Sequence, residues 1–122
     1  MVAAICDHGY RHIDTAKVYQ NEKEIGEGLQ ECFKRGIKRE DLFITTKLWH
    51  DADKEDVEGA LRRQLASLQL EYLDLYIIHW ILPNIDWEKE DPIGKTPLHK
   101  VWEQLERCVD LGLVRSIGVS NC

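Results

Sequence analysis

Four apolar runs of the sequence each end on a polar or ionisable side chain. In chain order these end residues are Asp14, Lys47, His79 and the pair Ser120 and Asn121. In parallel α/β folds, ligands bind outside the carboxyl ends of the strands, because loops and helix N-termini converge there. If the runs are strands, their end residues form one shared site, and Tyr19, in the loop beyond Asp14, lies within reach of it.

The side chains gathered in this way suit proton transfer to a carbonyl oxygen. A free phenol has a pKa of about 10, and an ammonium close by favours its ionised form and lowers that value. A carboxylate such as Asp14, paired with Lys47, would hold the ammonium in place, and an imidazole such as His79 can orient a carbonyl by hydrogen bonding. The pattern therefore predicts that Tyr19 donates a proton to a carbonyl that receives hydride.

The segments between the strand ends carry helix signals. Apolar residues recur there at helical spacing, as in the stripe Val57, Ala60, Leu61, Leu65 and Leu68. The expected N-caps are Asn21 (with Glu24 at the third helical position), Asp53 and Thr96 (with Pro97 in the first turn), and Gly9, Gly36 and Gly112 are expected to close helices. Gly26 and Gly28, inside the helix that follows Asn21, suggest a close backbone approach, because glycine is unfavourable in a helix interior, and simple tolerance of glycine is the alternative.

Strands are expected at residues 11–14, 42–46, 73–78 and 116–119. Strands that alternate with helices pair in parallel through right-handed crossovers, which leaves a doubly wound sheet or a (β/α)8 barrel. No Gly-x-Gly-x-x-Gly follows a strand, and chemistry spread over consecutive strand ends is typical of barrels, so a (β/α)8 TIM barrel is favoured. A whole barrel needs about 250 residues. The chain therefore predicts an α/β fold that is roughly half of a barrel, with residues 80–95 as a loop or insertion.

Composition excludes several classes of partner. The net charge of −6 argues against binding nucleic acid, because phosphate binding needs a basic face. No segment approaches the roughly 20 apolar residues of a membrane span, and no basic leader precedes the short apolar run at the start. The four cysteines form no Cys-x-x-Cys pair, which favours reduced thiols. We therefore expect a cytoplasmic protein.

Several stretches match, in order, the motifs of a known enzyme family. They are residues 9–16 (GYRHIDTA) followed by Tyr19 and Asn21-Glu22, residues 45–49 (TTKLW), residues 73–80 (LDLYIIHW) and residues 118–121 (GVSN). On these motifs the chain resembles the aldo-keto reductases, NAD(P)H-dependent enzymes built on a (β/α)8 barrel. The resemblance runs through nearly all of residues 1–122, which we interpret as one partial barrel domain.

The resemblance implies roles for particular residues. The implied catalytic tetrad is Asp14, Tyr19, Lys47 and His79, with Tyr19 as the acid. The implied cofactor-binding residues are Asp14 with Ser120 and Asn121, the last two at the nicotinamide carboxamide, and the implied substrate-binding residues are Tyr19, Trp49, His79 and Trp80. The implied reaction reduces small aldehydes and ketones to alcohols. NADPH is the expected cofactor with NADH as the alternative, and no metal is implied.

The sequence also departs from the family pattern. Ile81 and Leu82 intervene before Pro83, where the family usually has proline directly after the His-Trp pair, and Cys122 stands where an aromatic residue is usual. The segment that reads the cofactor's adenosine phosphate has no counterpart. We therefore expect the 122-residue chain, by itself, to be inactive and to self-associate through open sheet edges.

Three other interpretations of the site residues were weighed. Asp14 with His12 could form a His-x-Asp metal site, but no third ligand has suitable spacing, and a buried, hydrogen-bonded His12 is favoured. Lys47 at a strand end could be the nucleophile of a Schiff-base aldolase, which leaves Tyr19 unexplained. A non-catalytic barrel relative, or a truncated product that only binds cofactor or partners, is the third. Measured carbonyl reduction separates it from the enzyme.

Overall fold

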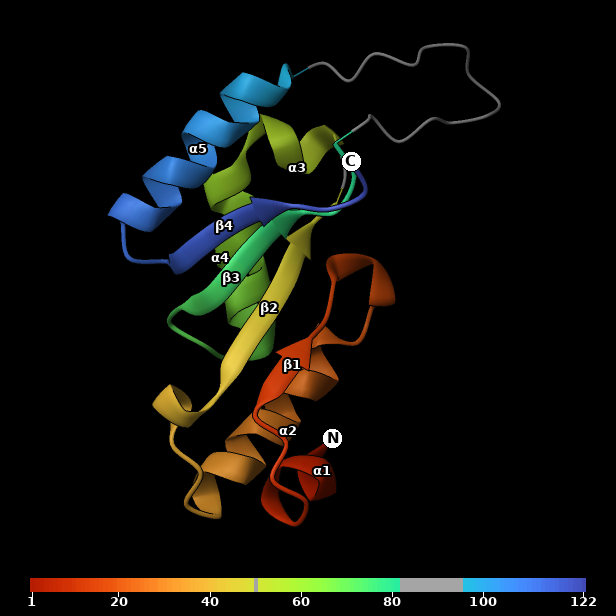
Figure 1. The fold of residues 1–122 in the computed structure, drawn as a ribbon, viewed down its shortest axis with the longest axis vertical. Coiled ribbons are helices and arrows are strands. Elements are labelled where there is room, and N and C mark those ends of the chain that lie inside the picture. The colour runs from red at the N-terminus through yellow and green to blue at the C-terminus, as the bar shows by residue number, and fades with distance from the viewer. Residues whose placement is uncertain (50, 82–95) are drawn as a thin grey trace.

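The computed structural model describes residues 1–49, 51–81 and 96–122 (Figure 1). The helices are α1 (Val2–Cys6), α2 (Glu22–Lys34), α3 (Asp51–Glu55), α4 (Val57–Leu68) and α5 (Leu98–Asp110), with 3₁₀ turns at Lys17–Tyr19 and Arg39–Asp41. The strands are β1 (His12–Asp14), β2 (Phe43–Leu48), β3 (Leu73–Ile78) and β4 (Val114–Val119). His50 and most of the predicted loop at 80–95, including Leu82 and Pro83, lie outside the described residues.

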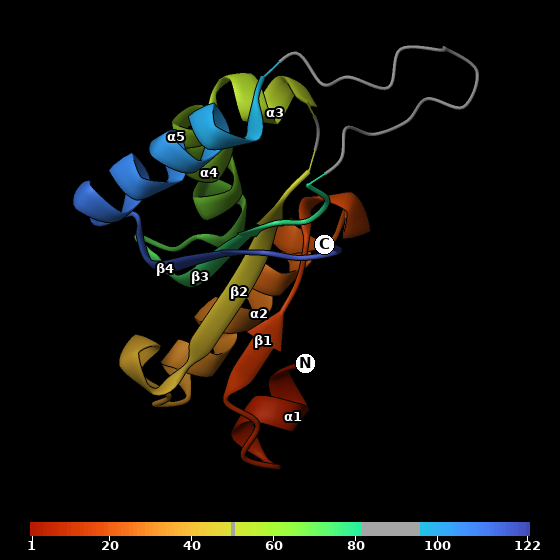
Figure 2. The ribbon, with the colours of Figure 1, turned by 45° about the horizontal axis from the view of Figure 1, so that its top comes forward.

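The four strands form one parallel sheet in the order β1-β2-β3-β4. Each strand pairs with its neighbour in the sequence, as expected for strands joined by helical crossovers. Helices α2, α4 and α5 lie on one side of the sheet (Figures 1 and 2). The predicted alternation of strands and helices is therefore confirmed, and all four carboxyl ends point to the same edge.

The core lies between the sheet and these helices. Its members include Leu29 of α2, Ile44 of β2, Leu61 of α4, Leu73 of β3 and Leu105 of α5, all fully buried. Burial of apolar side chains stabilises the fold by about 25 cal/mol per Å² removed from water. Among the described residues, none of the helices combines the length and the apolar composition needed to cross a bilayer.

Two predicted helix caps were wrong. Asp56, and not Asp53, is the N-cap of α4, where its side chain accepts a hydrogen bond of 2.9 Å from the Gly59 N–H. Asp53 lies inside α3, because its carboxylate is engaged by Lys17. Helix α5 is capped by Pro97 with extended backbone instead of by Thr96. Pro97 has ψ of 142° and so lies outside the helix, which places the start of α5 one residue later than predicted.

Strand β2 is longer than predicted and includes Lys47. Lys47 and Leu48 pair with Ile77 and Ile78 of β3, so the parallel ladder continues past the expected end at Thr46. This pairing fixes the backbone of Lys47 within the sheet. The lysine that the sequence placed after a strand is therefore held by the sheet itself.

Of the two glycines predicted to mark a close backbone approach, Gly26 does so between two helices, whereas Gly28 faces only the side chains of Met1 and Val2. A Cβ on Gly26 would lie 2.5 Å from the Ser67 carbonyl oxygen and 2.9 Å from that of Leu68, at the end of α4. Both neighbours are backbone atoms and cannot rotate away. Helix α2 can pack this closely on α4 only because residue 26 has no side chain.

Replacing Gly26 by alanine should lower the free energy of unfolding by about 1–3 kcal/mol, the usual cost of overpacking. Gly28→Ala is the matched control in the same helix, because its Cβ meets only the ends of the Met1 and Val2 side chains. We expect Gly28→Ala to be neutral or to stabilise by up to about 1 kcal/mol through helix propensity. Urea unfolding followed by circular dichroism measures both, and equal midpoints for the two variants would contradict this account.

The outer strands of the described sheet present open edges. Strands β1 and β4 each pair with one neighbour only, and two apolar side chains, Phe43 at the start of β2 and Val119 at the end of β4, are each 43% exposed. Open edges and exposed apolar side chains recruit other chains. The 122-residue chain by itself should therefore run in size-exclusion chromatography with light scattering above its 14.2 kDa mass. Phe43→Lys with Val119→Lys should shift it toward monomer, and a monodisperse wild-type monomer would refute the expectation.

Candidate active site

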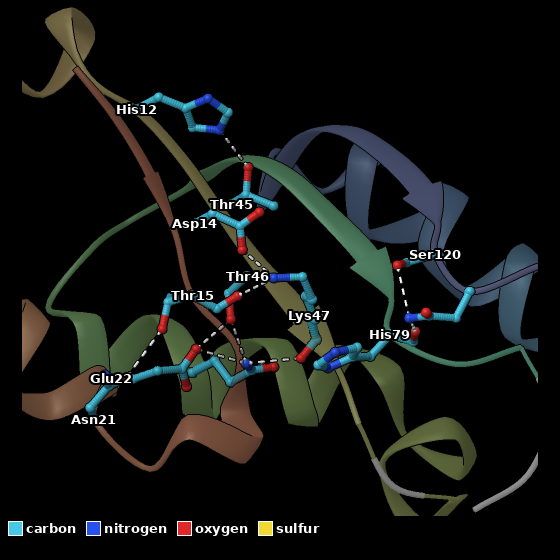
Figure 3. Close-up of polar contacts among 12 residues, drawn as sticks. His12, Asp14, Thr15, Asn21, Glu22, Thr45, Thr46, Lys47, His79 and Ser120 are labelled. Carbon is cyan, nitrogen blue, oxygen red and sulfur yellow. Dashed lines mark hydrogen bonds and ion pairs between the residues drawn. The ribbon is translucent and has the colours of Figure 1, made fainter. Parts of the chain in front are cut away.

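The polar strand-end residues meet at one edge of the sheet, as the sequence predicted. Asp14 is the last residue of β1, Lys47 lies in β2, His79 follows β3 and Ser120 follows β4. Figure 3 shows these four residues together at the carboxyl ends of the strands. Tyr19 joins them from the 3₁₀ turn Lys17–Tyr19, which lies between β1 and α2.

The Lys47 ammonium is buried and has two oxygen partners. It donates to the Asp14 carboxylate and, over 2.9 Å, to the Thr15 carbonyl oxygen (Figure 3). The lysine side chain is 8% exposed, whereas that of Asp14 is 56% exposed. A buried charge is tolerated when it is paired and hydrogen-bonded. The pair therefore fixes a positive charge at the sheet edge and leaves the carboxylate partly open to a ligand.

The Tyr19 ring lies against both the ammonium and the imidazole. The Lys47 Nζ is 5.5 Å from the centroid of the phenol ring, and the His79 ring lies edge-on at 6.3 Å between centroids. Tyr19 itself is 51% exposed. A phenol that is open to solvent on one side and faces a fixed cation on the other has the surroundings of a proton donor.

His79 is packed between two tryptophans at the end of β3. Trp49 lies edge-on at 4.9 Å between ring centroids, and Trp80 stacks at 6.5 Å. Burial, followed by the charge of Lys47, lowers the pKa of the imidazole below its ordinary value. Its Nδ1 is buried without a hydrogen-bond partner among the described residues. His79 is therefore a neutral imidazole at neutral pH with unused hydrogen-bonding capacity.

Ser120 and Asn121 tie the end of β4 to the end of β3. The Asn121 side-chain amide donates to the His79 carbonyl oxygen over 2.8 Å and to the Ser120 hydroxyl over 3.1 Å. Asn121 has a left-handed backbone, with φ of 54°, which asparagine tolerates better than most residues. The amide oxygen of Asn121 accepts no hydrogen bond within the described part of the chain, so it can serve a ligand.

His12 does not match its prediction in full. Its Nε2 lies 3.3 Å from the Thr45 hydroxyl, so it is hydrogen-bonded as expected (Figure 3). The residue is exposed, however, and not buried, because its side chain lies with Asp14 on the face of β1 opposite to Ile13, which packs in the core. The described residues contain no cluster of three metal-ligating side chains.

Two sets of buried polar residues near the site were missed from the sequence. Lys17 bonds both carboxylate oxygens of Asp53, at 2.6 and 2.7 Å, and so links the turn that carries Tyr19 to α3. Gln64 and Glu22 meet beneath Lys47. One signal was present, because Gln64 falls among the apolar residues of the α4 stripe, where a polar side chain must have buried partners.

Comparison with known proteins identifies the family. The model of the aldo/keto reductase family matches residues 1–122. Aldo-keto reductase family 1 member C13 of Mus musculus is 50% identical over 94% of this chain and 39% of its own length. NADP-dependent D-sorbitol-6-phosphate dehydrogenase of Malus domestica is 45% identical over 93% of this chain and 40% of its own.

Solved structures agree with the sequence comparisons. The aldose reductase of Schistosoma japonicum superposes with a TM-score of 0.86 at 41% identity, over 97% of this chain and 42% of that one. An aldo-keto reductase of Bombyx mori, solved in complex with NADP, superposes with a TM-score of 0.83 at 41% identity, over 97% of this chain and 38% of that one. The chain spans about two fifths of the length of these relatives, and its parallel sheet with helices is the corresponding part of a (β/α)8 barrel. The chain belongs to the aldo/keto reductase family.

Proposed function

We propose that this chain provides the catalytic residues of an NAD(P)H-dependent oxidoreductase that reduces small aldehydes and ketones to alcohols. The observation that carries the proposal is the contact of one exposed phenol, Tyr19, with both a buried ammonium and a neutral imidazole at adjacent strand ends. Membership of the aldo/keto reductase family supports the same reaction class. The free cysteines suit a reducing cytoplasm.

The residues at the end of β4 fit a nicotinamide cofactor. The carboxamide of a nicotinamide offers two N–H donors and one acceptor oxygen. The free amide oxygen of Asn121 can accept from its N–H groups, and the Ser120 hydroxyl can donate to its oxygen. The half-exposed Asp14 carboxylate, at the end of β1, adds a further acceptor at the same edge of the sheet. A bound nicotinamide would supply the hydride. NADPH is the proposed cofactor, in keeping with the NADP complex of the Bombyx mori relative, and NADH is the alternative.

The chain's own residues perform the proton half of the reaction. His79, neutral and packed between Trp49 and Trp80, donates a hydrogen bond that orients the substrate carbonyl, and the two tryptophans border the substrate. Tyr19 releases its phenolic proton to the carbonyl oxygen as negative charge develops there. The Lys47 ammonium stabilises the phenolate that remains, and Asp14 holds the ammonium in place.

The Schiff-base alternative is disfavoured by the contacts of Lys47. An aldolase nucleophile must be a neutral amine with access to the substrate. The Lys47 nitrogen is instead engaged by the Asp14 carboxylate and the Thr15 carbonyl, and its side chain is 8% exposed. The non-catalytic alternative is a relative that only binds cofactor or partners. It predicts the same fold as the enzyme, so only a measurement of carbonyl reduction distinguishes the two.

Tyr19→Phe, introduced into an active barrel that contains residues 1–122, should lower kcat for carbonyl reduction by about 100-fold or more, because general acid catalysis contributes roughly 10²–10⁴ in rate. Cofactor affinity, measured by quenching of NADPH fluorescence, should stay unchanged. Tyr10→Phe is the matched control, since Tyr10 is 65% exposed and precedes the strand. Retention of more than a few per cent of the rate in Tyr19→Phe would remove this residue from the role of proton donor.

His79 should titrate below the ordinary histidine value of 6.5, because burial and the Lys47 charge both disfavour the imidazolium. Its contribution to stability is then fully present above the unfolded pKa and is lost as pH falls through the folded pKa. Nuclear magnetic resonance of the imidazole protons measures the midpoint. Lys47→Met should move it upward, since the variant removes the cation and leaves the Asp14 carboxylate unpaired. A midpoint at or above that of the urea-unfolded chain would contradict the neutral imidazole.

A further inference from the structure

A buried polar network lies on the helix side of the sheet, directly beneath Lys47. Its members are Glu22 of α2, Thr46 of β2, Gln64 of α4 and Tyr76 of β3, and none is more than 7% exposed. Figure 3 shows Glu22 and Thr46 next to each other below Lys47. Four elements that are separate in the sequence therefore meet at one buried point.

Gln64 is the centre of this network. Its side-chain amide nitrogen shares its two hydrogens among three acceptors, the Glu22 carboxylate at 2.9 Å, the Thr46 hydroxyl at 3.0 Å and the main-chain carbonyl oxygen of Lys47 at 3.3 Å. Its amide oxygen accepts from the Tyr76 hydroxyl at 2.6 Å. The Thr46 hydroxyl in turn donates to the same Glu22 oxygen. Both polar atoms of the Gln64 side chain are thus engaged.

Fold stability alone is a weak reason for this network. Burial raises the pKa of the Glu22 carboxyl, against the opposing effect of its hydrogen bonds, and raises that of the Tyr76 phenol well above its ordinary value. Apolar side chains of similar volume commonly replace buried polar groups without loss of stability. Satisfied buried networks do, however, hold their members in one arrangement.

The network acts on the backbone at the two places that matter for the site. Thr46 directly precedes Lys47, and Gln64 bonds the carbonyl of Lys47 itself, so the strand is fixed on both sides of the lysine Cα. Glu22 is the first residue of α2, close after the turn that carries Tyr19. Lys47 reaches Asp14 and the Thr15 carbonyl from this anchored backbone.

We propose that Gln64 is a positioning residue, which with Glu22 and Thr46 holds the β2 backbone so that the Lys47 ammonium stays buried against Asp14. The purpose of this positioning rests on the function proposed above, but the hydrogen bonds that produce it do not depend on that function. The role can therefore be tested through Lys47 itself in the 122-residue chain, without any measurement of activity.

The test measures how fast each lysine reacts with an N-hydroxysuccinimide acetate under native conditions, resolved by peptide mass spectrometry. In Gln64→Met, acetylation of Lys47 should be about fivefold faster relative to exposed Lys34, as expected for the loss of one net hydrogen bond. Gln104→Met is the matched control, because Gln104 also donates to a main-chain carbonyl, that of Lys54 at 3.0 Å, and accepts from the Val57 N–H. It should leave Lys47 unchanged.

Two further variants separate positioning from general loosening. Glu22→Gln keeps an oxygen acceptor for Thr46 and Gln64 and should retain the wild-type rate, whereas Glu22→Leu should behave like Gln64→Met. Tyr76→Phe removes only the hydroxyl that donates to Gln64 and serves as the mild variant if Gln64→Met does not fold. It should accelerate Lys47 acetylation by about twofold.

An unchanged Lys47 rate in Gln64→Met, or an equal rise in Gln104→Met, would overturn the proposal. The same would hold if Tyr76→Phe, used in place of an unfolded Gln64→Met, left the rate unchanged. In an active barrel, Gln64→Met should lower kcat with little change in KM. If Lys47 becomes more reactive as expected but the wild-type barrel reduces no carbonyl, the positioning role stands and the proposed function fails.

Discussion

The rest of the site depends on keeping a lysine ammonium buried at the edge of a parallel sheet. A buried ammonium is costly unless oxygen atoms surround it, and here the Asp14 carboxylate and the Thr15 carbonyl provide them. Both oxygens come from the neighbouring strand and its continuation, so the contact requires the observed register, in which Asp14 pairs with Thr45. A slip of one residue would turn Lys47 to the opposite face of the sheet. The register of the sheet therefore determines the geometry of the site.

The two faces of the sheet have different roles. On the helix side, apolar residues and the network centred on Gln64 pack against the strands, and Gly26 lets α2 approach α4 without a side chain between them. On the opposite side and at the carboxyl edge, Tyr19, Asp14 and Asn121 are exposed. Exposed side chains can meet a ligand, but they hold their positions only because the backbone beneath them is anchored from the helix side.

The sequence was sufficient to predict the strands and the meeting of their polar end residues at one edge of the sheet, because both leave local signals. An apolar run that ends on an ionisable side chain can be recognised without any knowledge of tertiary structure. The order of the motifs along the chain indicated the family. It was not sufficient for contacts between crossover helices. Asp53 and Asp56 are equally good caps by composition, and the ion pair of Asp53 with Lys17, from a distant loop, cannot be seen in the sequence. The bonds from Gln64 to Glu22 and Tyr76 likewise depend on how α4 lies over the sheet.

The exposure of His12 was misjudged for a related reason. Its position on a strand suggested burial, yet the fraction of a strand side chain that is covered depends on the layers packed over it. Periodicity reports which residues share a face, and it does not report whether anything covers that face. Sequence reasoning therefore predicted correctly that His12 is hydrogen-bonded, and wrongly that it is buried.

The hydrogen bond from the Asn121 side chain to the main-chain oxygen of His79 has a thermodynamic consequence. Any ligand that draws on the Asn121 amide acts, through this bond, on the strand end that carries the imidazole. A contact that strengthens or weakens the bond changes the free energy of the His79 conformation, and linkage requires that the effect be reciprocal. The factor by which a molecule held at Asn121 changes the affinity for one held at His79 is therefore the same factor in the opposite direction. Whatever coupling this hydrogen bond carries between the two strand ends, it carries equally both ways.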